Sequence, residues 1–153
     1  MLPAFGNPHE LTEIDERLSL APDDVSLLFS RACLLDLLGR NDEAKDAYIE
    51  VIKRDGGHIG ALGNLGTLLY NVGYRSAARL TYGEALKHHP RDLRTLINLA
   101  NALLENNELA IASDLYERAL AVDASGPYAT TYALAADGHL ATLSNIAGTE
   151  AAH

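Results

Sequence analysis

A period of 34 residues constrains this chain more than any other feature of its sequence. The pattern is clearest from Ile59 to Pro90, where small residues and a tyrosine stand at fixed places. The places that recur most plainly are held by Ala44, Ala78 and Ala112, and by Tyr48, Tyr82 and Tyr116. A fixed period of this length is typical of stacked repeats, in which each unit buries its apolar side only against a neighbour. The sequence therefore predicts a repeat array.

Apolar residues three and four apart within each period indicate paired amphipathic helices. The expected helices span residues 8–20, 24–38, 41–54, 58–71, 75–88, 92–105, 108–121 and 127–143. Gly39, Gly73 and Asn107 stand at one place of the period, and these residue types readily adopt positive φ. We expect a left-handed cap there, with Asn7 and Asn41 as N-caps of the first and third helices. The fold class is all-α.

The period also suggests how the chain is divided. We expect a single domain over residues 1–153. Its parts are a half repeat at 8–22, full repeats at 25–58, 59–92 and 93–126, a capping helix at 127–143 and a frayed tail at 144–153.

Composition narrows the class of protein. The net charge is −9, and a general nucleic-acid binder needs a basic face, so we expect no nucleic-acid partner. The first residues do not read as a signal peptide, and no apolar run is long enough for a membrane span, so no membrane partner is expected. The single cysteine, Cys33, fits a reducing compartment and suggests a cytoplasmic location.

The repeat unit resembles the tetratricopeptide repeat. The residues that carry the resemblance in the middle unit are Leu62, Leu65, Gly66, Leu69, Ala78, Tyr82, Ala85 and Pro90. The units on either side match at most of these places but depart at others, with Arg31, Val51, Gly56 and Ala124. The resemblance implies a right-handed α-solenoid of helix-turn-helix repeats, with small residues where paired helices approach closely.

The resemblance also implies a concave groove lined by the first helix of each pair, which binds a peptide. The candidate peptide-binding residues are Phe29, Cys33, Gly63, Asn64, Thr67, Tyr70, Asn71, Arg94, Ile97, Asn98 and Asn101. Asn64 and Asn98 resemble the asparagine ladder of the O-linked N-acetylglucosaminyltransferase type; the alternative is that they are only solvated. A carboxylate clamp for acidic tails is doubtful, because Phe29 and Cys33 replace its lysine and asparagine.

Other features of the sequence do not indicate a catalytic or metal-binding site. Gly60 and Gly63 either leave room for a bulky partner side chain beside Tyr70 or adjust local packing. Cys33 has no histidine close in sequence to activate it, and adjacent His88 and His89 project to different sides of a helix. We therefore expect no catalytic residues, no metal and no cofactor.

These observations favour a non-catalytic scaffold that binds a peptide or protein segment. One alternative is the N-terminal repeat module of a larger enzyme, such as a glycosyltransferase. Another is a homo-oligomer formed through an apolar face of the last helix, with Leu134, Leu140, Leu143 and Ile146.

Overall fold

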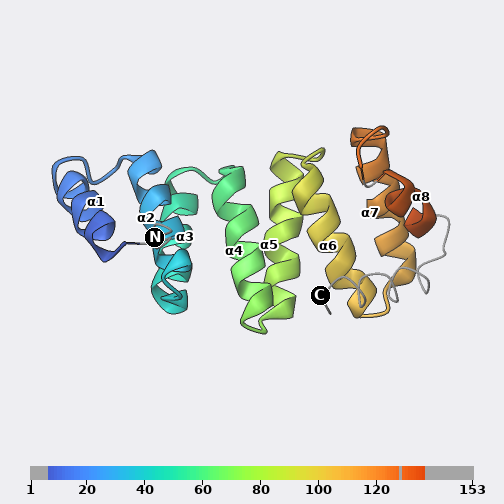
Figure 1. The fold of residues 1–153 in the computed structure, drawn as a ribbon, viewed down its shortest axis with the longest axis horizontal. Helices are drawn as coiled ribbons and strands as arrows, with labels where there is room; N and C mark the ends of the chain where they lie inside the picture. The colour runs from blue at the N-terminus through green and yellow to red at the C-terminus, as the bar shows by residue number, and fades with distance from the viewer. Residues whose placement is uncertain (1–6, 128, 137–153) are drawn as a thin grey trace, which may run out of the picture. The chain divides into compact units, whose positions relative to one another are not determined.

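The computed structural model describes residues 7–127 and 129–136. Within them the chain is all-α, as predicted (Figure 1). The helices are α1 (Pro8–Leu20), α2 (Val25–Leu37), α3 (Asn41–Arg54), α4 (Ile59–Asn71), α5 (Arg75–His88), α6 (Leu93–Glu105), α7 (Leu109–Val122) and α8 (Ala129–Ala136). For α1 to α7, the predicted bounds agree with the observed ones to within a residue or so, because capping residues recur with the period.

The turn inside each helix pair has one geometry. Gly39, Gly73 and Asn107 have φ values of 71°, 95° and 61°, so the predicted left-handed caps are confirmed. The next residue in each case donates its backbone N–H to the carbonyl five positions back, as in Arg40 to Leu35 at 2.9 Å. This closure satisfies carbonyls at the helix end and reverses the chain at once.

The first helix of each pair begins at a side-chain cap, again with a spacing of 34. Asp24, His58 and Asp92 accept the backbone N–H of the residue three places on, at 3.0, 3.0 and 2.9 Å. Asn7 caps α1, as predicted, by accepting from His9. The prediction for Asn41 was wrong: Arg40 is the cap residue, because the left-handed turn at Gly39 lets α3 begin immediately.

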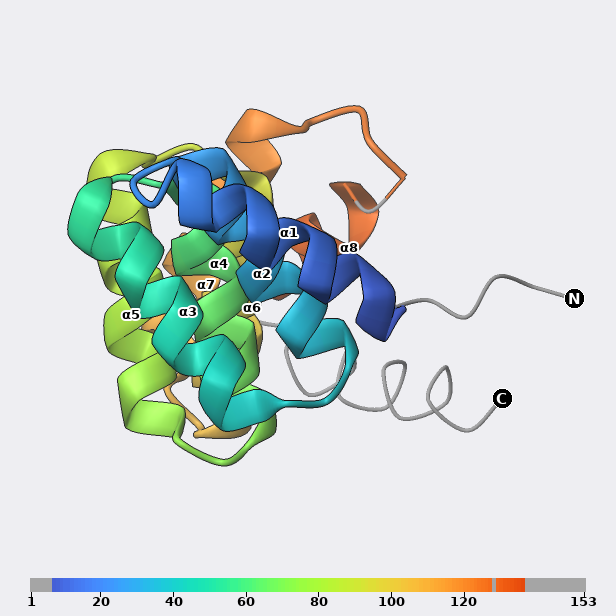
Figure 2. The same ribbon diagram turned by 90° about the vertical axis from the view of Figure 1, so that its left-hand side faces the viewer.

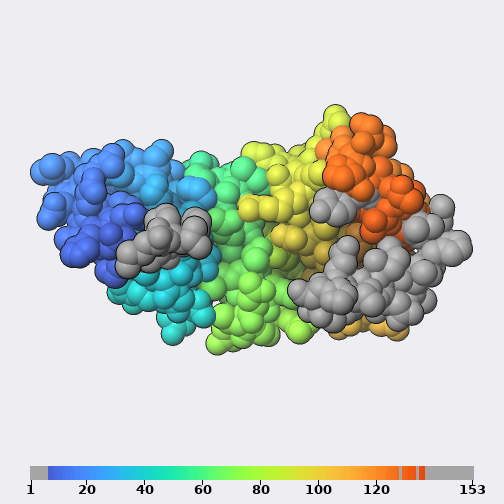
Figure 3. All heavy atoms as spheres, in the orientation of Figure 1, coloured from blue at the N-terminus to red at the C-terminus, as the bar shows by residue number. Residues whose placement is uncertain are grey.

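The chain divides into two compact units, residues 1–88 and 89–153. In the first unit α2 packs on α3, α4 packs on α5, and α3 joins the two pairs through α4. Figure 2 shows α1 lying over α2, which it covers as the predicted half repeat would. In the space-filling view the helices of this unit follow one another in chain order (Figure 3).

In the second unit α6 packs on α7, and α8 packs on α7. The Ser113 hydroxyl of α7 donates to the carbonyl of Ala136 at the end of α8. The predicted last helix therefore begins at Ala129 rather than at residue 127. Its residues 137–143, and the predicted tail at 144–153, lie outside the described residues.

Small residues let the helices of each pair approach closely. Ala44, Ala78 and Ala112 are all fully buried, as are Ala32 and Ala100. A Cβ placed on Gly66 would lie 2.5 Å from the ring of Tyr82, so only glycine fits where α4 meets this tyrosine. The repeated small residues and tyrosines therefore form the core, as the period predicts.

Candidate functional site

The predicted groove residues lie on the first helices of the pairs and fall in both units. Those of α2 and α4 belong to the first unit: Phe29, Cys33, Gly63, Asn64, Thr67, Tyr70 and Asn71. Those of α6 belong to the second: Arg94, Ile97, Asn98 and Asn101. The two sets are described separately.

In the first unit, α2 touches α4 through an amide and a thiol. The Nδ2 of Asn64 donates to the Sγ of Cys33 at 3.6 Å, and both residues are half-buried. Sulfur is a weak acceptor, so this contact positions the amide without binding it strongly. The structure thus places Asn64 and Cys33 on one partly exposed surface formed by α2 and α4, here called the α2–α4 surface.

Hydroxyl groups of the buried tyrosines form hydrogen bonds with candidate residues. The Tyr82 hydroxyl lies 3.1 Å from the hydroxyl of Thr67, and Tyr116 donates to Asn101 at the equivalent place 34 residues on. In the first pair Tyr48 donates to Asp36 at 3.0 Å. Burial raises the pKa of Tyr48 far above its ordinary value and that of Tyr116 to about 12. The hydroxyls of Tyr48 and Tyr116 are therefore neutral donors, and Thr67, which is half-buried, lies at the edge of the core.

Phe29 is half-buried and fills space that the sequence suggested was open. Its ring lies 4.6 Å from the ring of His58, centroid to centroid. A Cβ on Gly60 would come within 2.7 Å of the Phe29 ring, and Gly63 is buried. The suggestion that these glycines admit a partner side chain was therefore wrong at Gly60, where glycine is needed because Phe29 packs against it.

The remaining candidates are more exposed. Arg75 of α5 donates to the Tyr70 hydroxyl at 3.2 Å, and its guanidinium carbon lies 5.0 Å from the ring centroid. Asn71 is exposed at the end of α4. On α6, Arg94 and Asn101 are exposed, while Ile97 and Asn98 are half-buried.

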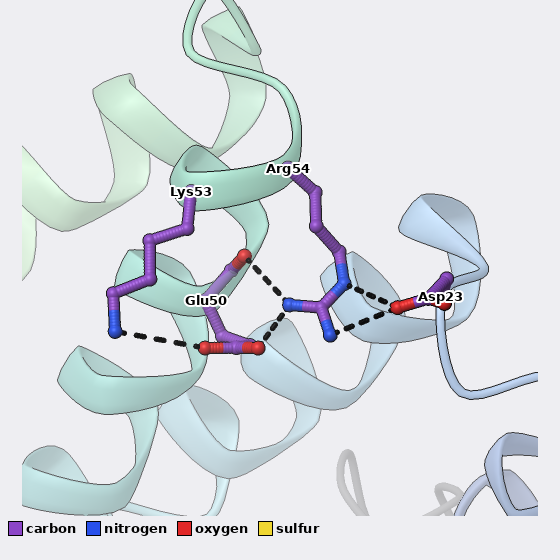
Figure 4. A network of polar contacts seen from close by, with 4 residues as sticks. All are labelled: Asp23, Glu50, Lys53 and Arg54. Carbon is purple, nitrogen blue, oxygen red and sulfur yellow. Dashed lines mark hydrogen bonds and ion pairs between the residues drawn. The ribbon is translucent and has the colours of Figure 1, made fainter.

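A charged network joins the end of α3 to the turn between α1 and α2. It was not predicted from the sequence. Arg54 contacts Asp23 at 3.1 Å and also pairs with Glu50, which lies 3.9 Å from Lys53 (Figure 4). A second pair, Arg31 with Asp15 at 2.6 Å, connects α2 to α1. Opposite charges about one period apart, as in Asp23 and Arg54, were the available signal.

An apolar hollow on the other helices was also missed. It opens between α3 and α5 over α4, with a volume of about 350 Å³, and is here called the α3–α5 hollow. Its walls are Ile49, Ile52, Lys53, Leu62, Leu65, Leu80, Thr81 and Glu84. Leu80 is 77% exposed and Ile49 is 37% exposed. Ile49 and Leu80 stand at different places of the period, so the repeat pattern did not indicate the hollow.

Two findings limit the chemistry of the described residues. Across residues 7–127 and 129–136, no three His, Cys, Asp or Glu side chains gather as metal ligands would. Over the same part of the chain, no helix combines the length and the apolar character that crossing a membrane requires.

The order and packing of the helices define the class of fold, which is an α-solenoid built from helix-turn-helix repeats. A sequence model of the tetratricopeptide repeat matches residues 25–58, the span of the first predicted repeat. The human tetratricopeptide repeat protein 7A is 26% identical over 114 residues, which is 74% of this chain and 13% of that protein. The match supports a tetratricopeptide repeat at residues 25–58, and the chain spans only a small part of this curated relative.

Solved structures share the fold. A tetratricopeptide repeat protein from Parabacteroides merdae has a TM-score of 0.75 at 16% identity, covering 83% of this chain and 51% of its own. The Yersinia enterocolitica type III secretion chaperone SycD, solved with a peptide of the translocator YopD, has a TM-score of 0.67 at 20% identity. That match covers 75% of this chain and 91% of SycD.

Proposed function

We propose that this chain is a non-catalytic scaffold that binds an extended peptide or protein segment on the α2–α4 surface. The observation that carries the proposal is the half-buried amide of Asn64, held beside Cys33 where α2 meets α4. An amide offers both donors and an acceptor, so it can pair with a peptide backbone whatever the side chains are. A peptide carbonyl is a stronger acceptor than the sulfur that Asn64 now contacts.

Aromatic groups at both ends of this surface add apolar contact. Phe29 presents part of its ring near the start of α4, and Tyr70 lies near the end of α4 under Arg75. Tyrosine and arginine are enriched among the residues that dominate binding energy at interfaces. The segment we propose is therefore mostly extended, with an apolar side chain near Phe29 and a hydrogen-bonding group near Tyr70.

The fold supports this reading, since SycD, a protein of the same fold, was solved with a bound peptide. The candidate residues of α6, Arg94, Ile97, Asn98 and Asn101, are proposed as a contact surface of the second unit, to be tested by itself. The likeness of Asn64 and Asn98 to an asparagine ladder stays a prediction, as does the cytoplasmic location.

The test uses peptides selected from a random library on the full chain. Asn64→Ala and Tyr70→Ala should each weaken binding of the selected peptides at least about tenfold by fluorescence anisotropy. Asn41→Ala and Tyr74→Ala are matched controls, because they make the same changes at exposed places on α3 and before α5. Peptides that bind all four variants with wild-type affinity would show that the α2–α4 surface is not the site.

The second unit is tested with the same selected peptides. Asn98→Ala should weaken binding if α6 contributes, and Asn106→Ala, an exposed asparagine just after α6, is its control. Equal affinities for these two variants would limit the site to α2 and α4.

The alternatives stay hypotheses. The relative is much longer than this chain, which is compatible with a repeat module inside a larger enzyme, and the intact reading frame decides between them. For self-association through the last helix, Leu140, Leu143 and Ile146 and the side chain of Leu134 lie outside the described residues.

A further inference from the structure

Asp36 of α2 is a half-buried carboxylate beside the proposed peptide site. It lies three residues after Cys33, and residues three apart share a helix face. The Tyr48 hydroxyl donates to Oδ2 of Asp36 at 3.0 Å. Burial, Cys33 and Asp36 together raise the pKa of Tyr48, so the thiol and the carboxylate both lie at this hydroxyl. Asp36 is therefore part of the α2–α4 surface, next to the contact of Cys33 with Asn64.

The contact with Tyr48 does not require a charge at Asp36. In the other helix pairs the tyrosines at the same place of the period, Tyr82 and Tyr116, meet a neutral hydroxyl and a neutral amide. A neutral acceptor would serve Tyr48 as well, and it would avoid the cost of holding a charge partly away from water. The carboxylate therefore indicates a partner other than Tyr48.

Among the described residues of the first unit, no cation pairs with Asp36. The other half-buried carboxylates of that unit each have one: Glu50 pairs with Arg54, and Glu84 lies 2.9 Å from Lys87. Charged groups that are partly buried are normally paired. Asp36 accepts a single side-chain hydrogen bond, and a carboxylate can accept about four, so it retains the capacity to bind a cation.

We propose that the segment bound on the α2–α4 surface is basic, and that a lysine or arginine of the segment pairs with Asp36. This partner class deepens the proposed function and rests on it, because the same surface binds the segment. The chain carries −9, and residues 1–88 hold thirteen Asp and Glu against nine Lys and Arg, so a basic segment is attracted and an acidic one repelled. Within the unit, Arg75 is held over the Tyr70 ring and donates to its hydroxyl, so the cation for Asp36 comes from the segment.

The place of Asp36 along α2 predicts a spacing within the segment. Phe29 and Asp36 are two helical turns apart, so they lie on one face of α2 and about 10 Å apart along its axis. An extended segment advances about 3.3 Å per residue. The apolar side chain near Phe29 and the cation at Asp36 should therefore be about three residues apart in the segment.

The experiment uses the peptides selected from the random library on the full chain, with affinity measured by fluorescence anisotropy. They should contain lysine or arginine, and replacing that residue by glutamine should weaken binding at least about fivefold. Asp36→Asn should weaken binding by the same factor, because the amide still offers an oxygen to Tyr48 but carries no charge. Asp46→Asn is the matched control, since it makes the same change in net charge at an exposed place on α3.

A double-mutant cycle tests whether the two charges meet. If they do, Asp36→Asn should have little effect on the peptide in which glutamine replaces the cation, and urea denaturation should show that the variant is folded. Binding that is weakened by Asn64→Ala but not by Asp36→Asn, or selected peptides without a basic residue, would overturn the basic partner and leave the proposed site standing. Wild-type affinity in both variants would overturn the site and the partner class together.

Discussion

In both helix pairs of the first unit, the end of the second helix lies against the turn that precedes the first helix, but the residues that meet there differ. In the first pair Arg54 of α3 reaches back to Asp23 in the preceding turn and also pairs with Glu50. In the second pair His88 stands at the place of Arg54 and lies 3.4 Å from Glu84, while Gly57 stands at the place of Asp23. A Cβ on Gly57 would lie 3.2 Å from His88, so the two places adjoin as Asp23 and Arg54 do.

The N-caps of the two pairs differ in the same sense. Asp24 caps α2 with a carboxylate, and His58 caps α4 with the Nδ1 of its imidazole ring. The first pair is therefore joined by carboxylates and a guanidinium, and the second by imidazole rings. Two repeats of one fold can share a core and still be joined by different side chains.

The largest loss of stability should come from a feature that both helix pairs share, the buried alanine of the second helix. Ala44→Glu and Ala78→Glu each place a carboxylate at a fully buried position, so each should cost at least about 3 kcal/mol in the free energy of unfolding. Urea denaturation measures it, with Ala77→Glu at an exposed place as control. A wild-type midpoint in either variant would mean that the repeats do not share this register.

The caps should contribute measurably to each pair. His58→Ala should cost about 1 kcal/mol in the free energy of unfolding, because the ring Nδ1 accepts the N–H of Ala61.

The matched variant for the cap is Asp24→Ala. Its cost should exceed that of His58→Ala, since a carboxylate at a helix N-terminus also interacts favourably with the helix dipole. Urea denaturation of the two variants measures the difference. Equal costs for the two alanine variants would contradict the difference between the caps.

The charged network should matter less, because its members are exposed. Arg54→Ala should lower the melting temperature by about 2 °C, since surface ion pairs contribute little. His88→Ala should have a smaller effect, because its imidazole lies 3.4 Å from Glu84 whereas Arg54 contacts both Asp23 and Glu50. Differential scanning calorimetry at low salt compares them, and an equal loss would show that the charge of Arg54 is not what distinguishes the junctions.

The pKa values of Glu50 and Glu84 should depend on different partner residues. Arg54 is the main cause of the lowered pKa of Glu50, whereas Lys87, more than His88, lowers the pKa of Glu84. The stabilisation from both is therefore present above the ordinary value of 4.5 and is lost as the pH falls below it. Carboxyl NMR titration should show Arg54→Ala raising the pKa of Glu50, and His88→Ala changing that of Glu84 less.

The smallest effect should come from making the junctions alike. Gly57→Asp places a carboxylate beside the His88 ring and should raise the melting temperature by about 1 °C, because the carboxylate can accept a hydrogen bond from the imidazole. Differential scanning calorimetry measures the change. A loss would mean that contact with the His88 ring, 3.2 Å from the new Cβ, outweighs this hydrogen bond.

The period predicted most of the fold, because helix bounds, turns and buried small residues all follow from local sequence. Gly39, Gly73 and Asn107 were recognised from residue type alone. The Asp23–Arg54 contact was not, since it depends on which way two long or exposed side chains turn across a junction. The cap at His58 was missed because histidine is an uncommon cap, although its spacing from Asp24 and Asp92 identifies it.

The candidate site was less predictable than the fold. The resemblance to the tetratricopeptide repeat assigned Phe29, Asn64 and Thr67 to one groove, but it does not predict which residues each side chain contacts. Phe29 turns over Gly60, and Thr67 lies against Tyr82, because buried rings need neighbours of a given size and polarity. The α3–α5 hollow is lined by residues of three helices, and its exposed members Ile49 and Leu80 stand at different places of the period, so the repeat pattern did not indicate it.

The contact between Tyr82 and Thr67 gives the protein a built-in optical signal. The chain has seven tyrosines and no tryptophan, so its near-ultraviolet emission comes from tyrosine alone. A peptide that competes for the Thr67 hydroxyl would change the surroundings of the Tyr82 phenol, which lies against it at 3.1 Å. Occupancy of the α2–α4 surface can therefore be followed in the unlabelled protein, with Tyr82→Phe as the variant that removes this response.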